Sequence, residues 1–81
     1  MLEFYFQLLG YDIKISDTHI AEALKLLPEK KRKVVLMSYY LNMSVAEIAE
    51  YLHLKQSTIY YHRKSSLNLI KEYIEKTNSK K

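Results

Sequence analysis

The stretch Ser44–Lys64, SVAEIAEYLHLKQSTIYYHRK, decides the fold, because it holds two short helical patterns separated by a tight break. Ser44 and Glu47 match the capping box S-x-x-E, in which two reciprocal hydrogen bonds start a helix. The inward side of that helix is assigned to Val45, Ile48, Ala49 and Leu52. The helix is predicted to halt around His53, and the helical pattern resumes at Gln56. Two helices with a break of about three residues between them form a helix-turn-helix.

The residues around the break fit the geometry of this motif. Ala49 is the small side chain expected at the helix crossing, since a larger one would push the second helix outward. His53 stands where the chain reverses, and histidine is among the few residues besides glycine that tolerate a positive φ. A left-handed conformation is therefore predicted at His53. The apolar residues expected to fix the angle between the two helices are Ile48, Leu52, Leu54 and Ile59.

The start of the last helix is the candidate DNA-reading surface. With Ile59 turned into the core, helical geometry points the neighbouring side chains toward solvent. The expected DNA contacts are Lys55, Gln56, Ser57, Thr58, Tyr60, Tyr61 and Lys64. The Gln56 amide can pair with adenine edges, hydroxyl groups can donate to phosphates or bases, and the two lysines can neutralise phosphates. For both tyrosines, and more so for Tyr60, packing against a neighbouring helix stays open as the alternative.

His62 follows Ile59 by three residues and should point partly inward. We expect it to hydrogen-bond Glu47 on the preceding helix, which is a structural role. The other histidines, His19 and His53, lack the H-x-x-x-H spacing of a metal site, so no metal is expected.

The distribution of charge favours a polyanionic partner. The formal net charge is +4 and the pI lies near 9.3. The interval between Glu50 and Glu72 contains no acidic residue. Its basic residues are Lys55, Arg63, Lys64 and Lys71. Positive charge concentrated on one segment is typical of nucleic-acid binding, although a solvated basic face gives the same pattern.

The N-terminal segment, residues 1–16, is predicted to be extended. It contains two apolar runs, Phe4–Leu9 and Tyr11–Ile15, which are broken at Gly10, so a β-hairpin is one interpretation. Two strands alone are barely stable. The hairpin therefore needs support from the helices.

Residues 17–76 are expected to form one helical DNA-binding domain. Its first helix should start at Ser16 or Asp17, either of which can cap it. The single proline suits a first helical position, which favours a second helix over residues 28–41. The final helix should fray into a disordered tail over residues 77–81. Its inward side is assigned to Ile59, Ser66, Ile70 and Ile74.

Composition narrows the class of protein. The chain has no cysteine, so neither a disulfide nor a thiolate zinc site can hold it together, and apolar packing must do so. This suits the reducing cytoplasm, which is the expected location. No stretch is long enough to span a membrane. No nucleophile beside a base, no paired carboxylates and no phosphate-cradling glycine loop are found, so neither an enzyme nor a cofactor site is expected.

Four short segments of the chain carry a family resemblance. They are Leu27–Arg32 (LPEKKR), Tyr39–Ser44 (YYLNMS), Glu47–Ala49 (EIA) and Ser57–Tyr60 (STIY). Together they resemble region 4 of the sigma-70 family, and within it the sigma-like helix-turn-helix regulators of Gram-positive conjugative transposons. The resemblance implies an all-α, four-helix bundle with a C-terminal helix-turn-helix. It also implies that the final helix reads a promoter element with the seven residues named above, while the first two helices offer a surface to the β-subunit flap of RNA polymerase.

Two other interpretations stay open. The output domain of LuxR-type regulators is similar at Thr58–Ile59 and at His62, but such domains dimerise through their last helix, whereas a sigma-like module works as a monomer, the state favoured here. The second alternative is a protein-interaction module whose basic face binds an acidic protein and no DNA. It predicts no salt-dependent DNA affinity.

Overall fold

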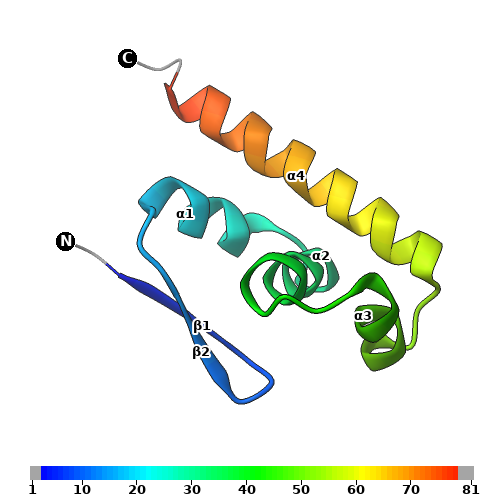
Figure 1. Ribbon diagram of the computed structural model, residues 1–81. Helices are drawn as coiled ribbons and strands as arrows, with labels where there is room; N and C mark the ends of the chain where they lie inside the picture. The colour runs from blue at the N-terminus through cyan, green and yellow to red at the C-terminus, as the bar shows by residue number, and fades with distance from the viewer. Residues whose placement is uncertain (1–2, 79–81) are drawn as a thin grey trace.

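The structure, a computed structural model, describes residues 3–78 and consists of a small hairpin followed by packed helices (Figure 1). The elements are β1 (Phe4–Leu8), β2 (Tyr11–Ile15), α1 (Thr18–Leu26), α2 (Glu29–Val35), the π-helix η1 (Leu36–Tyr40), α3 (Val45–Leu52) and α4 (Gln56–Asn78). The mainly helical class with four α-helices agrees with the expectation. The N-terminal hairpin, which the sequence left open, is formed.

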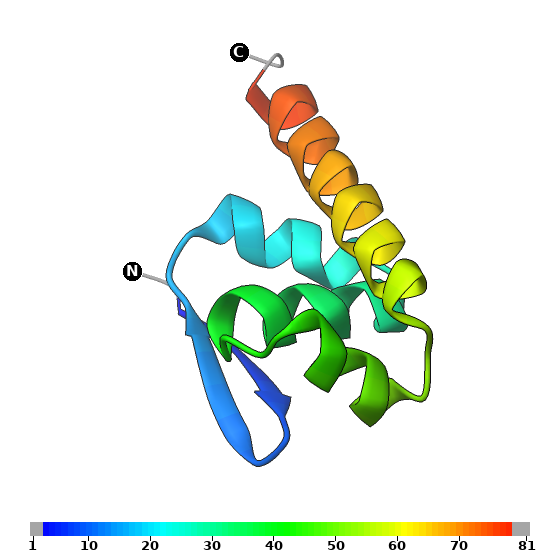
Figure 2. The same cartoon turned by 45° about the vertical axis from the view of Figure 1, so that its right-hand side comes forward.

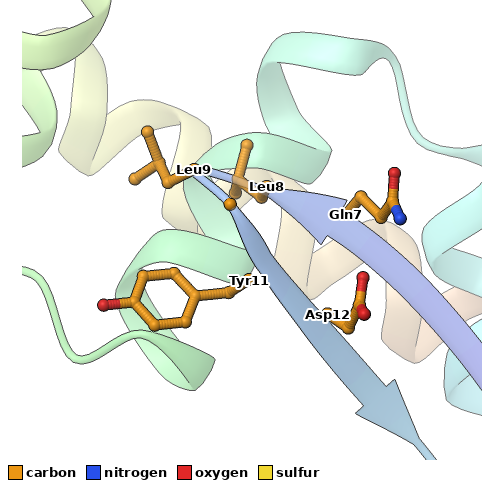
Figure 3. A pocket seen from close by; sticks show the side chains of 6 residues that line it. Gln7, Leu8, Leu9, Tyr11 and Asp12 are labelled. Atoms are coloured by element: carbon orange, nitrogen blue, oxygen red, sulfur yellow. The ribbon is translucent and has the colours of Figure 1, made fainter.

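The hairpin forms because its two strands alternate polar and apolar side chains and present one apolar face. β1 pairs antiparallel with β2, with Phe4 opposite Ile15. Leu9 and Gly10 make the turn, and both have positive φ values, 55° and 79°, as the tight turns that match the twist of paired strands require. Glycine adopts this conformation without strain, but leucine does not. The Leu9 side chain packs against the helices, and this contact holds it there (Figure 3).

α1 begins as the sequence predicts. Asp17 is its N-cap, and the Asp17 carboxylate accepts the backbone N–H of Ile20 at 3.0 Å. A cap of this kind satisfies one of the free amides at a helix start.

The second helix differs from the expected continuous α-helix over residues 28–41. α2 ends at Val35, and in η1 the Leu41 amide donates to the Leu36 carbonyl, five residues back, at 3.0 Å. The four residues 34–37 are all buried. Val35 and Leu36 belong to one apolar cluster, whereas Val34 and Met37 belong to another. Because this segment is buried on two sides, its packing overrides the regular helical pitch.

Two apolar clusters hold the domain together. The first joins the hairpin to α1, α2 and the start of η1 through Ile13, Ile15, Ala21, Leu24, Leu27, Val35 and Leu36. The second joins α2 and η1 to the helix-turn-helix through Val34, Met37, Ile48, Ala49 and Ile59. The hairpin and α4 lie on different sides of the central helices (Figures 1 and 2).

α4 is the longest element, with 23 residues, and it contacts α1, α2 and α3 in turn. Its C-terminal end extends away from the other helices (Figure 2). The helix includes Thr77 and Asn78, so it runs into the segment expected to be a disordered tail. The Thr77 hydroxyl donates to the Tyr73 carbonyl at 2.9 Å. The rest of that expected tail, residues 79–81, lies outside the described residues.

Candidate nucleic-acid interface

The helix-turn-helix is clamped by Ile59 of α4 and Ala49 of α3. Ile59 is fully buried and Ala49 is buried, and both lie in the second apolar cluster. The short Ala49 side chain lets the two helices approach, as the sequence predicts. The clamp fixes the rotation of α4 about its axis, and hence which of its residues face solvent.

The capping box and the turn also form as predicted. The Ser44 hydroxyl accepts the Glu47 amide at 3.1 Å, and the Glu47 carboxylate accepts the Ser44 amide at 2.8 Å. Hydrogen bonding from Ser44 lowers the pKa of Glu47 below its ordinary value. His53 adopts the left-handed conformation at φ 58° and ψ 45°, and the Leu54 amide closes the turn on the Ala49 carbonyl at 2.9 Å.

Six of the seven expected contact residues are exposed around the start of α4. They are Lys55, Gln56, Ser57, Tyr60, Tyr61 and Lys64. Tyr60 is 59% exposed and Tyr61 is 63% exposed, so neither ring is buried against a neighbouring helix. Thr58 is half-buried, and its amide donates to the Lys55 carbonyl at 3.0 Å. Thr58 thus lies at the edge of the surface rather than on it.

The start of α4 also suits an anion. The amides of Thr58 and Ile59 already donate to the Lys55 carbonyl, so the amides at the open end of the helix are those of Gln56 and Ser57. The first turn contains no acidic residue. A helix start of this kind favours negative charge, such as a phosphate group.

The comparison with known families agrees with this geometry. The family model for sigma-70, region 4 matches residues 19–67, which is more than half of the chain. The chain belongs to the sigma-70 region 4 family. Neither the curated proteins nor the solved structures give a match. The domain is thus a DNA-binding helix-turn-helix of a regulatory, non-catalytic family whose members bind DNA and RNA polymerase.

The matched region of this sigma region 4 domain omits the hairpin and the last part of α4. Among residues 3–78, no helix combines the length and the apolar character needed to cross a bilayer. In the same range, no cluster of three or more histidine and carboxylate side chains is placed to hold a metal ion.

The expected hydrogen bond between His62 and Glu47 is wrong. His62 Nδ1 lies 3.2 Å from Lys31 Nζ of α2, while the Glu47 carboxylate is engaged in the capping box. An ammonium group can only donate, so Nδ1 accepts and the His62 ring is neutral. Burial lowers the pKa of His62, and the charges of Lys31 and Lys30 lower it further.

Two contacts between a cation and a tyrosine flank α4, and the sequence did not predict either. Lys31 Nζ lies 4.7 Å from the centre of the Tyr61 ring. In the second contact, the Arg63 guanidinium lies 5.4 Å from the centre of the Tyr39 ring and donates a hydrogen bond to the Tyr39 hydroxyl at 3.4 Å. Both contacts join α4 to the α2–η1 segment. They depend on the crossing of helices distant in sequence, which a local pattern does not reveal.

The basic residues at positions 30–33 make different contacts from one another. Arg32 donates to the carbonyls of Leu24, Lys25 and Leu27 at the C-terminal end of α1. A cation is favourable there, because helix C-termini carry partial negative charge. Lys33 pairs with Glu29 at 3.6 Å. Lys31 faces α4 instead, as described above.

A shallow hollow beside the hairpin turn lies apart from this surface. It is lined by the residues of the turn and the strand ends, Gln7 to Asp12 (Figure 3). None of the expected contact residues lines it. Within residues 3–78, the residues expected to contact DNA therefore lie on the helix-turn-helix and not at this hollow.

Proposed function

We propose that this sigma region 4 domain regulates transcription by reading a promoter element in the major groove with the start of α4. The observation that carries the proposal is the full burial of Ile59 against Ala49. With Ile59 buried, the exposed side chains around it on α4 are those of Gln56, Ser57, Tyr60, Tyr61 and Lys64. The major groove admits an α-helix, and its base edges distinguish all four base pairs.

The proposed contacts divide into two classes. Gln56 and Tyr60 are assigned to the bases, since a glutamine amide can bond adenine in two places and an aromatic ring can touch a thymine methyl. The phosphate contacts are assigned to Lys55, Ser57, Thr58, Tyr61 and Lys64, whose ammonium and hydroxyl groups donate to oxygen. No acidic residue occurs from Tyr51 to Lys71, so none adjoins these lysines along the chain.

A contact with the β-subunit flap of RNA polymerase is part of the proposal. The hairpin covers apolar side chains of α1 and α2. The flap would therefore bind the part of the surface of these helices that the hairpin leaves exposed. Leu26, at the end of α1, is 70% exposed and is an apolar side chain of the kind such a contact buries. The domain would act as a monomer in the cytoplasm. Its expected kinship with regulators of conjugative transposons rests on residue resemblance alone.

Selection from random duplex DNA tests the proposal directly. Fragments retained by the full chain are sequenced, and affinity for the enriched site is measured by fluorescence anisotropy. If α4 reads the bases, one motif is enriched, and log affinity falls with log salt by about 0.9 per phosphate neutralised. Retention of DNA without any enriched motif would show that α4 does not read the bases. An absence of binding in dilute buffer would favour the protein-interaction alternative.

Two variants separate the two classes of contact. Gln56→Ala should relax the sequence preference at one base pair, by about 1 to 3 kcal/mol, and leave other positions unchanged. Lys64→Ala should weaken binding to all sequences alike and lower the salt slope by about one phosphate. Lys14→Ala on β2 is the control, since it removes the same charge from an exposed lysine on the hairpin. An equal loss on all sequences from Gln56→Ala contradicts its assignment.

A further inference from the structure

Lys31 of α2 stands outside the helix-turn-helix but contacts the α4 surface. Its ammonium donates to His62 Nδ1 at 3.2 Å and lies 4.7 Å from the centre of the Tyr61 ring. Tyr61 is itself 63% exposed. The Lys31 charge is therefore held beside an exposed residue of the proposed DNA-reading surface.

The Lys31 ammonium retains capacity for another acceptor. It has three N–H donors, and within residues 3–78 one hydrogen bond to it is found, that with His62. The Tyr61 ring attracts the positive charge without using a donor. No carboxylate of residues 3–78 forms an ion pair with it. A phosphate oxygen suits the Lys31 ammonium, because it carries negative charge and can accept the remaining N–H donors.

The surroundings of Lys31 add to the positive potential on this side of α4. The charges of Lys31 and Lys30 both act on His62 and oppose its protonation. The outer side of α3 differs, because a separate hollow there is lined by Glu47 and Glu50. Positive charge thus continues from α4 onto α2, while the outer face of α3 carries acidic groups.

We propose that Lys31 is an additional phosphate contact and that His62 is a positioning residue that orients it beside Tyr61. The DNA-binding surface then includes two segments, the start of α4 and the first turn of α2. His62 acts by accepting the Lys31 N–H while neutral and makes no contact with DNA itself. This inference rests on the proposed function, because it extends the same surface.

The salt dependence of DNA binding tests the role of Lys31. Affinity of the full chain for a short duplex of mixed sequence is measured by anisotropy between about 50 and 200 mM salt. Lys31→Gln should lower the slope of log affinity against log salt by about 0.9, and Lys31→Arg should keep it. Lys33→Gln is the matched control, since it removes the same charge from the same helix but from a lysine paired with Glu29.

The His62 variants test positioning. His62→Leu removes the acceptor and should weaken binding about two- to five-fold, whereas His62→Gln supplies an amide oxygen and should restore it. Thermal melting of each variant separates this effect from a loss of folding. A role confined to packing predicts no difference in DNA affinity between folded His62→Leu and His62→Gln, and that result overturns the positioning role.

The outcomes distinguish this inference from the proposed function. If Lys64→Gln lowers the salt slope but Lys31→Gln leaves it as in the wild type, the Lys31 contact is refuted and the proposed function stands. If neither variant changes the slope, or the unaltered chain binds no duplex, the proposed function fails together with this inference. A slope lowered equally by Lys31→Gln and Lys33→Gln reports general charge and also refutes a specific Lys31 contact.

Discussion

Replacing Ile59 by alanine tests the clamp on which the DNA-reading surface depends. Ile59 is fully buried among Val34, Met37, Ile48 and Ala49. Removing most of such a side chain costs about 2 to 5 kcal/mol, which combines lost burial with the cavity left behind. A domain of 81 residues has a total stability of about 4 to 12 kcal/mol. Ile59→Ala should therefore remove a large share of the free energy of unfolding.

A milder variant keeps the measurement possible if Ile59→Ala does not fold. Ile59→Val removes one methylene group and should cost about 0.5 to 1.5 kcal/mol. For a domain of this size, each kcal/mol lowers Tm by about 4 to 8 °C, so a decrease of about 2 to 12 °C is expected. Circular dichroism during heating and urea titration measures both quantities.

The neighbouring residue provides the control. Tyr60 is 59% exposed, so Tyr60→Ala should change stability by less than about 0.5 kcal/mol while weakening DNA binding. The two substitutions are adjacent in sequence and opposite in expected effect. If Ile59→Ala leaves the unfolding free energy unchanged, or Tyr60→Ala lowers it as much, the described rotation of α4 is incorrect.

Three further predictions concern the ends of α3 and the contact at Lys31. Ser44→Ala removes the N-cap of α3 and should lower stability by about 1 kcal/mol in urea unfolding, with the exposed Ser57→Ala as a comparison expected to stay near the wild type. His53→Gly should raise Tm, because glycine adopts the left-handed conformation without the strain of about 1 kcal/mol that a side chain brings; a lower Tm would contradict the strain. The pKa of His62 is below its ordinary value of 6.5, first because of burial and then because of nearby lysine charges. The native state therefore binds this proton less readily than the unfolded chain, so the stability from neutral His62 is present above pH 6.5 and is lost as the pH falls below it. The free energy of unfolding of the wild type, measured as the pH is lowered from above to below 6.5, should decrease by an amount that is missing in His62→Gln. Equal pH profiles for the two proteins would refute a contribution from His62.

Features set by neighbouring residues could be predicted from the sequence. The capping box at Ser44 and Glu47, the left-handed His53 and the inward direction of Ile59 all follow from local spacing and from the conformations that each residue type allows. The exposed positions around Ile59 follow from the same helical geometry. This is why most of the candidate surface was recognisable before any tertiary contact was known.

Features set by packing could not be predicted in the same way. The π-helical turn of η1 arises where residues 34–37 are buried on two sides, and the sequence period alone does not report that burial. The partner of His62 depends on where α2 crosses α4. One signal was available, however: a Glu47 carboxylate engaged in a capping box is already used, which argues against its pairing with His62.

The hairpin tip links two parts of the domain that the family match separates. Leu8 packs against both apolar clusters, and Leu9 packs against the one that contains Ala49 and Ile59. Because a side chain shared between two cores couples their opening, we expect the hairpin strands and the helices that carry the reading surface to unfold as one cooperative unit. A substitution that destabilises either core should accordingly lower the protection of backbone amides against hydrogen exchange in β1 and in α3 together.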